Sequence, residues 1–170
     1  MRKRELKVAQ DSAAPKSGQN EGREKEVLIE TSRFGEIEVD ENRIIHFPEG
    51  ILGFPQEKKF VILEHKPGSP FCWLQSVNSP ELAFVMMNPL MVKKDYLEAF
   101  PASEKRLLEG DEGKHMALFA FVTIPRGQAR KMSINLLGPI LININKKTGR
   151  QLVLANSCFS TRQPVFPDSE

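Results

Sequence analysis

The sequence lacks the patterns that mark secreted and membrane-spanning proteins. Its 170 residues include only two cysteines, Cys72 and Cys158, which lie far apart and form no C-x-x-C or Cys/His cluster. No basic-then-apolar leader opens the chain, so we expect reduced thiols in a cytoplasmic protein. The longest apolar runs, such as residues 116–124, are far shorter than the roughly 20 residues that a membrane-spanning helix needs. We therefore expect no segment that spans a membrane.

Catalytic motifs are also missing. The three histidines, His46, His65 and His115, have no carboxylate or cysteine at the spacing of a metal site or an activated nucleophile. The sequence contains no glycine-rich phosphate loop, no G-x-S-x-G and no H-E-x-x-H. These absences predict a protein that is not an enzyme, with no catalytic residue, no metal and no cofactor.

Charge is unevenly distributed along the chain. Residues 1–26 hold seven Lys or Arg and five acids; subtracting these from the totals of 24 and 22 leaves 17 of each sign for the rest. This first stretch has no aromatic residue and no apolar periodicity, so it cannot bury enough surface to offset the entropy of ordering. We expect residues 1–26 to form a disordered arm and residues 27–170 to form a single domain.

From Val27 onward the dominant pattern is an alternation of period two, rich in β-branched and aromatic residues and interrupted by turn residues. Several segments are apolar on both parities, which is typical of a closed or doubly covered sheet. The segments "GEIEV" and "RIIHF" predict a hairpin joined by "DEN". The other expected strands are residues 59–65, 71–77, 82–87, 115–124, 132–137, 139–145 and 150–156. Phe84, Phe119 and Phe121 are expected to be buried.

One segment, residues 95–114, has a helical pattern instead. It predicts one or two short helices, and it carries six acids against Lys105 and Arg106, a net charge of −4 from residue 95 to 113. Either this is a solvated helix face or it binds a basic partner. The acids are Asp95, Glu98, Glu104, Glu109, Asp111 and Glu112.

Two basic turns keep nucleic-acid binding open as an alternative function. The first contains Arg126, Arg130 and Lys131, and the second contains Lys146, Lys147 and Arg150. Small β-barrels bind single strands with basic loops and aromatic platforms. The balanced charge of residues 27–170 argues against it, because phosphate contacts need a strong positive footprint.

Seven short motifs in a fixed order resemble the flagellar assembly factor FliW family from about Thr31 to Val165: "FGEIEV", "IIHFPEGILGFP", "FVIL", "WLQSVNSPELAFVMMNP", "DY", "NLLGPILININ" and "QLVLANSCFSTRQPV". The resemblance implies a mostly β fold, a compact antiparallel β-barrel-like single domain with one short helical excursion. It also implies two protein partners, flagellin and the translational repressor CsrA, and no direct binding of nucleic acid. The family's usual Tyr-Ser-Thr-Arg reads "FSTR" here, with Phe159 in place of the tyrosine.

The resemblance suggests roles for two segments. Residues 47–55, "FPEGILGFP", place an apolar pair on a glycine- and proline-framed bend, where Ile51, Leu52 and Phe54 are candidate partner contacts. Alternatively, the bend folds back and closes one end of the barrel. We expect the bend and the strand "LAFVMM" to bind flagellin, and the acids Glu109, Asp111 and Glu112 to attract CsrA, whose RNA-binding surface must be basic.

Overall fold

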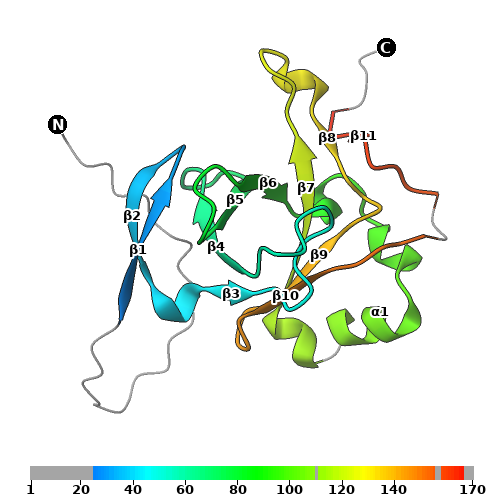
Figure 1. Cartoon of the computed structure of the whole chain (residues 1–170). Helices are drawn as coiled ribbons and strands as arrows, with labels where there is room; N and C mark the ends of the chain where they lie inside the picture. The colour runs from blue at the N-terminus through cyan, green and yellow to red at the C-terminus, as the bar shows by residue number, and fades with distance from the viewer. Residues whose placement is uncertain (1–24, 110, 156–157, 167–170) are drawn as a thin grey trace.

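The computed structural model describes residues 25–109, 111–155 and 158–166, and it is a mostly β protein with one α-helix. Seven strands form a closed barrel in the order β7-β6-β5-β4-β3-β10-β9, and the pairing of β9 with β7 completes the ring (Figure 1). The predicted barrel-like fold is confirmed. Its strands are β3 (Ile45–His46), β4 (Lys59–Glu64), β5 (Phe71–Ser76), β6 (Ala83–Met87), β7 (Met116–Thr123), β9 (Ile140–Asn143) and β10 (Thr148–Gln151).

One pairing in the ring is parallel. His46 of β3 lies opposite Thr148 of β10 in parallel register, whereas the other barrel pairings are antiparallel. The His46 N–H donates to the Lys147 C=O at 2.8 Å. A parallel pair needs a long crossover between its strands, and here almost the whole barrel forms that connection.

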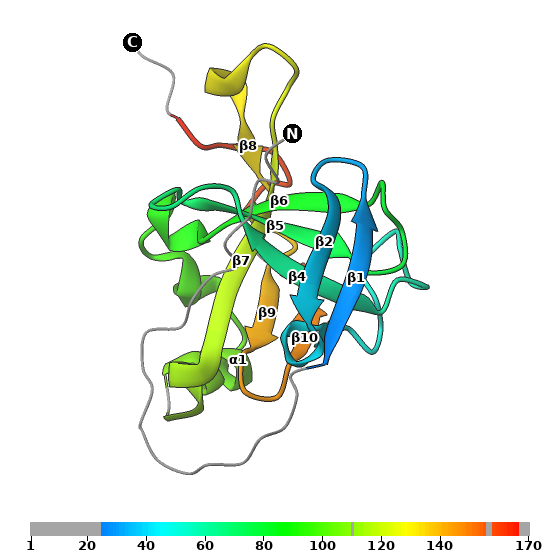
Figure 2. The ribbon, with the colours of Figure 1, turned by 90° about the vertical axis from the view of Figure 1, so that its left-hand side faces the viewer.

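The predicted hairpin between "GEIEV" and "RIIHF" is wrong. β2 (Gly35–Asp40) pairs with β1 (Glu26–Thr31) in a separate two-stranded sheet, beside the barrel in Figure 2. The segment "ENR" forms a 3-10 helix, Glu41–Arg43, because the Asp40 carboxylate caps it by accepting from the Asn42 N–H at 2.8 Å. The chain therefore leaves β2 for another sheet instead of returning along it.

The described fold begins two residues earlier than the predicted arm boundary. Glu26 pairs with Asp40 in the β1–β2 sheet, and the Lys25 C=O accepts from the Glu41 N–H at 2.9 Å. Residues 1–24, the rest of the predicted arm, lie outside the described residues.

A small extension continues the barrel on the far side of β7. The second half of β7 pairs with β8 (Ser133–Ile134), and β8 pairs with β11 (Gln163–Pro164). The connection from β7 to β8 rises from the barrel in Figures 1 and 2 and includes the 3-10 helix Ala129–Lys131.

The expected helical excursion is confirmed. It contains a 3-10 helix Tyr96–Ala99, the α-helix α1 (Ala102–Glu109) and a second 3-10 helix Asp111–His115, preceded by Pro89–Met91 after β6. The buried Tyr96 fixes it to the barrel, because its hydroxyl donates to the Leu136 C=O at 2.6 Å. Phe159 packs against the Tyr96 ring at 5.0 Å between centroids, so a ring without a hydroxyl fills this position.

Three apolar clusters form the core. The largest lies between β7, β8 and the helical excursion, a second fills the barrel around Phe47 and Phe60, and a third joins the β1–β2 sheet to the barrel. The prediction that Phe84, Phe119 and Phe121 are buried is wrong: they are half-buried, because they pack against the edge of the barrel cluster rather than within it. None of the described helices is long and apolar enough to cross a membrane.

Candidate functional site

Residues 47–55, which we call the bend, consist of consecutive tight turns. The Gly50 N–H donates to the Phe47 C=O at 2.9 Å, which closes the first turn. The Phe54 N–H donates to the Ile51 C=O at 2.7 Å, which closes a second turn that has Leu52 and Gly53 at its centre. A residue at the centre of a β-turn points away from the chain, so this geometry places Leu52 at the tip.

Glycine is required at both corners of the bend. Gly50 has φ +73°, and a Cβ there would lie 2.7 Å from the Phe54 carbonyl oxygen. Gly53 has φ +86°, which suits the third position of a type II turn. These corners fix the direction of the side chains between them before any partner binds.

The two apolar residues at the centre of the bend, Ile51 and Leu52, differ in exposure, which the sequence alone could not predict. Ile51 is 2% exposed and packs into the barrel cluster, as the closing interpretation expected. Leu52 is 63% exposed and Phe54 is 40% exposed. Leu52 and Phe54 are therefore the predicted contacts of the bend that a partner can reach in this conformation.

Strand β10 and its neighbours hold the bend in place. The Leu52 N–H donates to Oε1 of Gln151 at 3.0 Å, and the Gln151 amide donates in turn to the Gly138 C=O at 3.1 Å. The buried ring of Phe47 lies against Gly149, where a Cβ would be only 2.3 Å from Cζ of Phe47. Sequence reasoning missed Gln151 and Gly149, because their role depends on a partner about 100 residues earlier in the chain.

An aromatic strip extends from the bend across the barrel. The Phe54 ring meets the Phe84 ring edge-on at 5.5 Å, and Phe84 stacks on Phe121 at 4.5 Å. The register of β6 and β7 explains the stack, because Met86 pairs with Phe121 and Phe84 is the next residue on the same face. The strip joins the bend to "LAFVMM", the two segments that sequence analysis grouped.

The strip ends in a groove where β6 and β7 diverge. These two strands pair only at Met86 and Met87, after which β7 turns to pair with β8. The resulting groove of about 670 Å³ has a wall that includes Phe84, Val85, Phe121, Val122 and Ile124.

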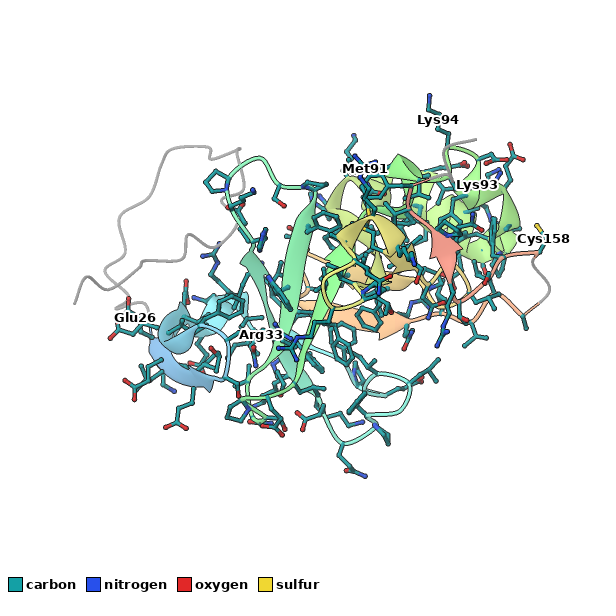
Figure 3. The ribbon with its side chains drawn as sticks, turned by 90° about the horizontal axis from the view of Figure 1, so that it is seen from above. Glu26, Arg33, Met91, Lys93, Lys94 and Cys158 are labelled. Carbon is teal, nitrogen blue, oxygen red and sulfur yellow. The ribbon has the colours of Figure 1, made fainter. Side chains whose placement is uncertain are left out.

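The acidic segment, residues 95–114, is more neutralised than its sequence suggests. Arg150 of β10 forms an ion pair with Glu104, and Lys93 forms one with Asp95 at 2.8 Å. The hydrogen bond from Lys93 lowers the pKa of Asp95. Both cations lie outside the segment, so the sequence sum of −4 overstates the field at its surface. Figure 3 shows Lys93 and Lys94 on the side of the molecule opposite Glu26.

The predicted CsrA contacts lie at the end of this segment. Glu109 is an exposed residue at the C-terminus of α1, within 3.9 Å of Lys105, and an exposed pair of this kind contributes little to stability. Asp111 and Glu112 belong to the 3-10 helix Asp111–His115, and their side chains lie outside the described part of the structure.

The bend and the acidic segment are neighbours. A pocket of about 570 Å³ lies between them, lined by Pro48 and Glu49 of the bend, Leu107 of α1, and Arg150 and Gln151 of β10. The structure thus brings the two predicted partner-binding segments to adjoining surfaces.

The two basic turns lie at opposite ends of the molecule. In Figures 1 and 2 the β7–β8 connection rises from one end of the barrel, and the β9–β10 turn lies at the other. Arg150 is already paired with Glu104. A nucleic-acid strand would therefore meet two separate clusters rather than one continuous track, which weakens the alternative function. In the described residues, no three His, Cys, Asp or Glu side chains are grouped to hold a metal.

Comparison with known proteins gives a consistent result. The family model described as "FliW protein" matches residues 27–165. A flagellar assembly factor FliW of Geobacter sulfurreducens is 41% identical over 138 residues, covering 81% of this chain and 86% of the relative. That of Magnetococcus marinus is 38% identical over 141 residues, covering 83% and 86%. A crystal structure of the flagellar assembly factor FliW superposes with a TM-score of 0.73 at 33% identity, covering 85% of this chain and 100% of the other.

Proposed function

Because the chain belongs to the FliW family of flagellar assembly factors, we propose that it binds flagellin and CsrA in exchange for one another. Bound to CsrA, it relieves the repression of flagellin translation. Bound to unsecreted flagellin, it is withheld from CsrA. A factor that acts on a translational repressor does so where translation occurs, in the cytoplasm.

One observation supports the bend and the groove between β6 and β7 as the binding site for flagellin. The exposed Leu52 and Phe54 lie at one end of the aromatic strip, and the groove between β6 and β7 lies at the other. This arrangement suits an apolar helical segment, as the family resemblance implies for the ends of flagellin, because such a helix presents apolar side chains along one face. The rigid turns of the bend leave little conformational entropy to lose on binding.

CsrA is assigned to the acidic segment by charge. Glu109 is exposed, and within the described residues its ion-pair partner is Lys105 at 3.9 Å. Asp111 and Glu112 follow it in sequence. Acidic side chains at a surface attract a basic partner and raise the rate of association more than the affinity. Lys93 and Arg150 offset Asp95 and Glu104, which favours Glu109 over these two acids.

The bend and the acidic segment adjoin, which is why we expect flagellin and CsrA to bind in exchange for one another. A protein partner typically covers about 800 Å² on each side of an interface. The pocket between the bend and α1 is lined by both segments, so a partner of ordinary size seated on one would extend over the other. Flagellin and CsrA would then exclude each other by overlap.

The test compares three variants of the full chain in binding assays with purified flagellin and CsrA. Leu52→Asp/Phe54→Asp should lose flagellin and keep CsrA. Glu109→Lys/Asp111→Lys/Glu112→Lys should associate more slowly with CsrA at low salt and keep flagellin. Leu28→Asp is the matched control, because Leu28 is 59% exposed but lies on the separate β1–β2 sheet. Loss of neither partner in the first variant would refute the role of the bend.

A further inference from the structure

The outer face of the small β7–β8–β11 sheet is a third surface, which adjoins the groove between β6 and β7 at Thr123. Thr123 of β7 pairs with Ser133 of β8, and Ser133 pairs with Pro164 of β11, so these three residues form one row across the strands. Met132 and Ile134, which flank Ser133 in the chain, are buried in the core. The row therefore faces outward.

A shallow groove of about 430 Å³ lies on this face. Three cations line it, together with two prolines and one aromatic side chain. These residues, which we call the basic face, are Pro125, Arg130, Lys131, Arg162, Pro164 and Phe166. Phe166 is 50% exposed.

In the part of the chain that the structure describes, the cations of the basic face form no ion pair. The sequence contains no Asp or Glu from residue 116 to 166, a stretch that includes β7, β8 and β11. Arg130, Lys131 and Arg162 make no ion pair with any carboxylate in the described residues. This differs from the acidic segment, where cations from neighbouring elements offset the acids.

We propose that the basic face binds an acidic segment of a partner polypeptide, with carboxylates on either side of an apolar side chain. The carboxylates contact Arg130, Lys131 and Arg162, and Arg is well suited to bidentate contacts with carboxylates. The apolar side chain covers Phe166. Charge complementarity and the exposed ring together define the occupant.

Two observations favour a polypeptide over nucleic acid. The other basic turn lies at the opposite end of the molecule, so the basic face does not continue into a longer phosphate track (Figure 2). Among the residues that line the groove, Phe166 is the only aromatic one, whereas single-strand binding uses successive stacking platforms. The face also lies away from α1 in Figure 1, so this inference does not depend on the proposed partner of the acidic segment.

The test uses fluorescence polarisation with the full chain and three labelled probes. The first is a synthetic peptide with two glutamates on each side of a leucine, the second is the same peptide with glutamine in place of glutamate, and the third is an oligouridylate of similar length. The glutamate peptide should bind best, and its affinity should fall as salt is added. Equal binding of the glutamine peptide, or tighter binding of the RNA, would overturn the proposal.

Charge-reversal variants locate the binding. Arg130→Glu/Arg162→Glu should weaken the glutamate peptide about tenfold or more, because it replaces two attractions by repulsions. Lys66→Glu/Lys146→Glu is the matched control, since it changes the net charge equally at two exposed lysines in other turns. A thermal melt of each variant verifies folding. An equal loss of affinity in both folded variants would show a general charge effect and refute the assignment.

Discussion

The bend makes a sharp prediction about two adjacent apolar residues. Ile51 is 2% exposed and Leu52 is 63% exposed, so truncating each to alanine should have very different effects. Ile51→Ala removes buried methyl and methylene groups and leaves a cavity, which costs about 2–5 kcal/mol. Leu52→Ala removes atoms that already contact water, and its effect should stay within about 0.5 kcal/mol.

These free energies correspond to measurable shifts in melting temperature. For a domain of this size, 1 kcal/mol shifts Tm by about 2–4 °C, so Ile51→Ala should lower Tm by about 4–20 °C and Leu52→Ala by about 2 °C at most. Urea unfolding monitored by fluorescence of Trp73, the single tryptophan, provides an independent measurement. Similar losses for both variants, or a larger loss for Leu52→Ala, would refute the assignment of Leu52 to the tip and Ile51 to the core.

Three further predictions concern residues beside the site and in the core. Gly149→Ala should destabilise the fold by about 1–3 kcal/mol in urea unfolding, because the added Cβ would overlap the Phe47 ring. An unchanged unfolding midpoint would show that this contact is unimportant. Tyr96→Phe should cost about 1–3 kcal/mol in the same assay, since it leaves the buried Leu136 carbonyl without its donor; an unchanged midpoint would contradict this role. Burial raises the pKa of the Cys72 thiol to about 12, so at pH 8 a thiol reagent should label the exposed Cys158 well before Cys72. The thiol of Cys72 ionises near pH 9.0 in the unfolded chain but only near pH 12 in the folded one. The free energy of unfolding should therefore fall as pH rises from about 9 to 12.

Most strands of the barrel and the helical excursion were predictable from sequence, because their signals are local, whereas β1 and β11 were not predicted. The β-branched and aromatic runs in "KFVILE" and "FCWLQS", and the helical pattern of residues 95–114, each act within a few residues. Pairing was less predictable. The partner of β2 is β1 rather than β3. The segment "DEN" suits a hairpin turn, but the Asp40 carboxylate caps a 3-10 helix there and directs the chain away from β2. The parallel contact of β3 with β10 has no local signal at all.

The site was predictable as a segment but not residue by residue. Two glycines framing an apolar pair indicated a bend, yet only the hydrogen bonds of the turn decide that Leu52 points outward and Ile51 inward. Likewise, the acids of residues 95–114 were visible in the sequence, but the neutralising Arg150 lies in a distant strand. Long-range contacts of this kind require the folded chain.

The support of the bend by β10 also sets the order of events during synthesis. Leu52 and Gln151 are 99 residues apart, and at about 5–20 residues per second the ribosome completes that interval in about 5–20 s. During those seconds the nascent chain has its bend sequence but not the strand that anchors it. Contacts between such distant residues also make folding slow. A newly made chain is therefore expected to have its bend anchored only late in translation or after release.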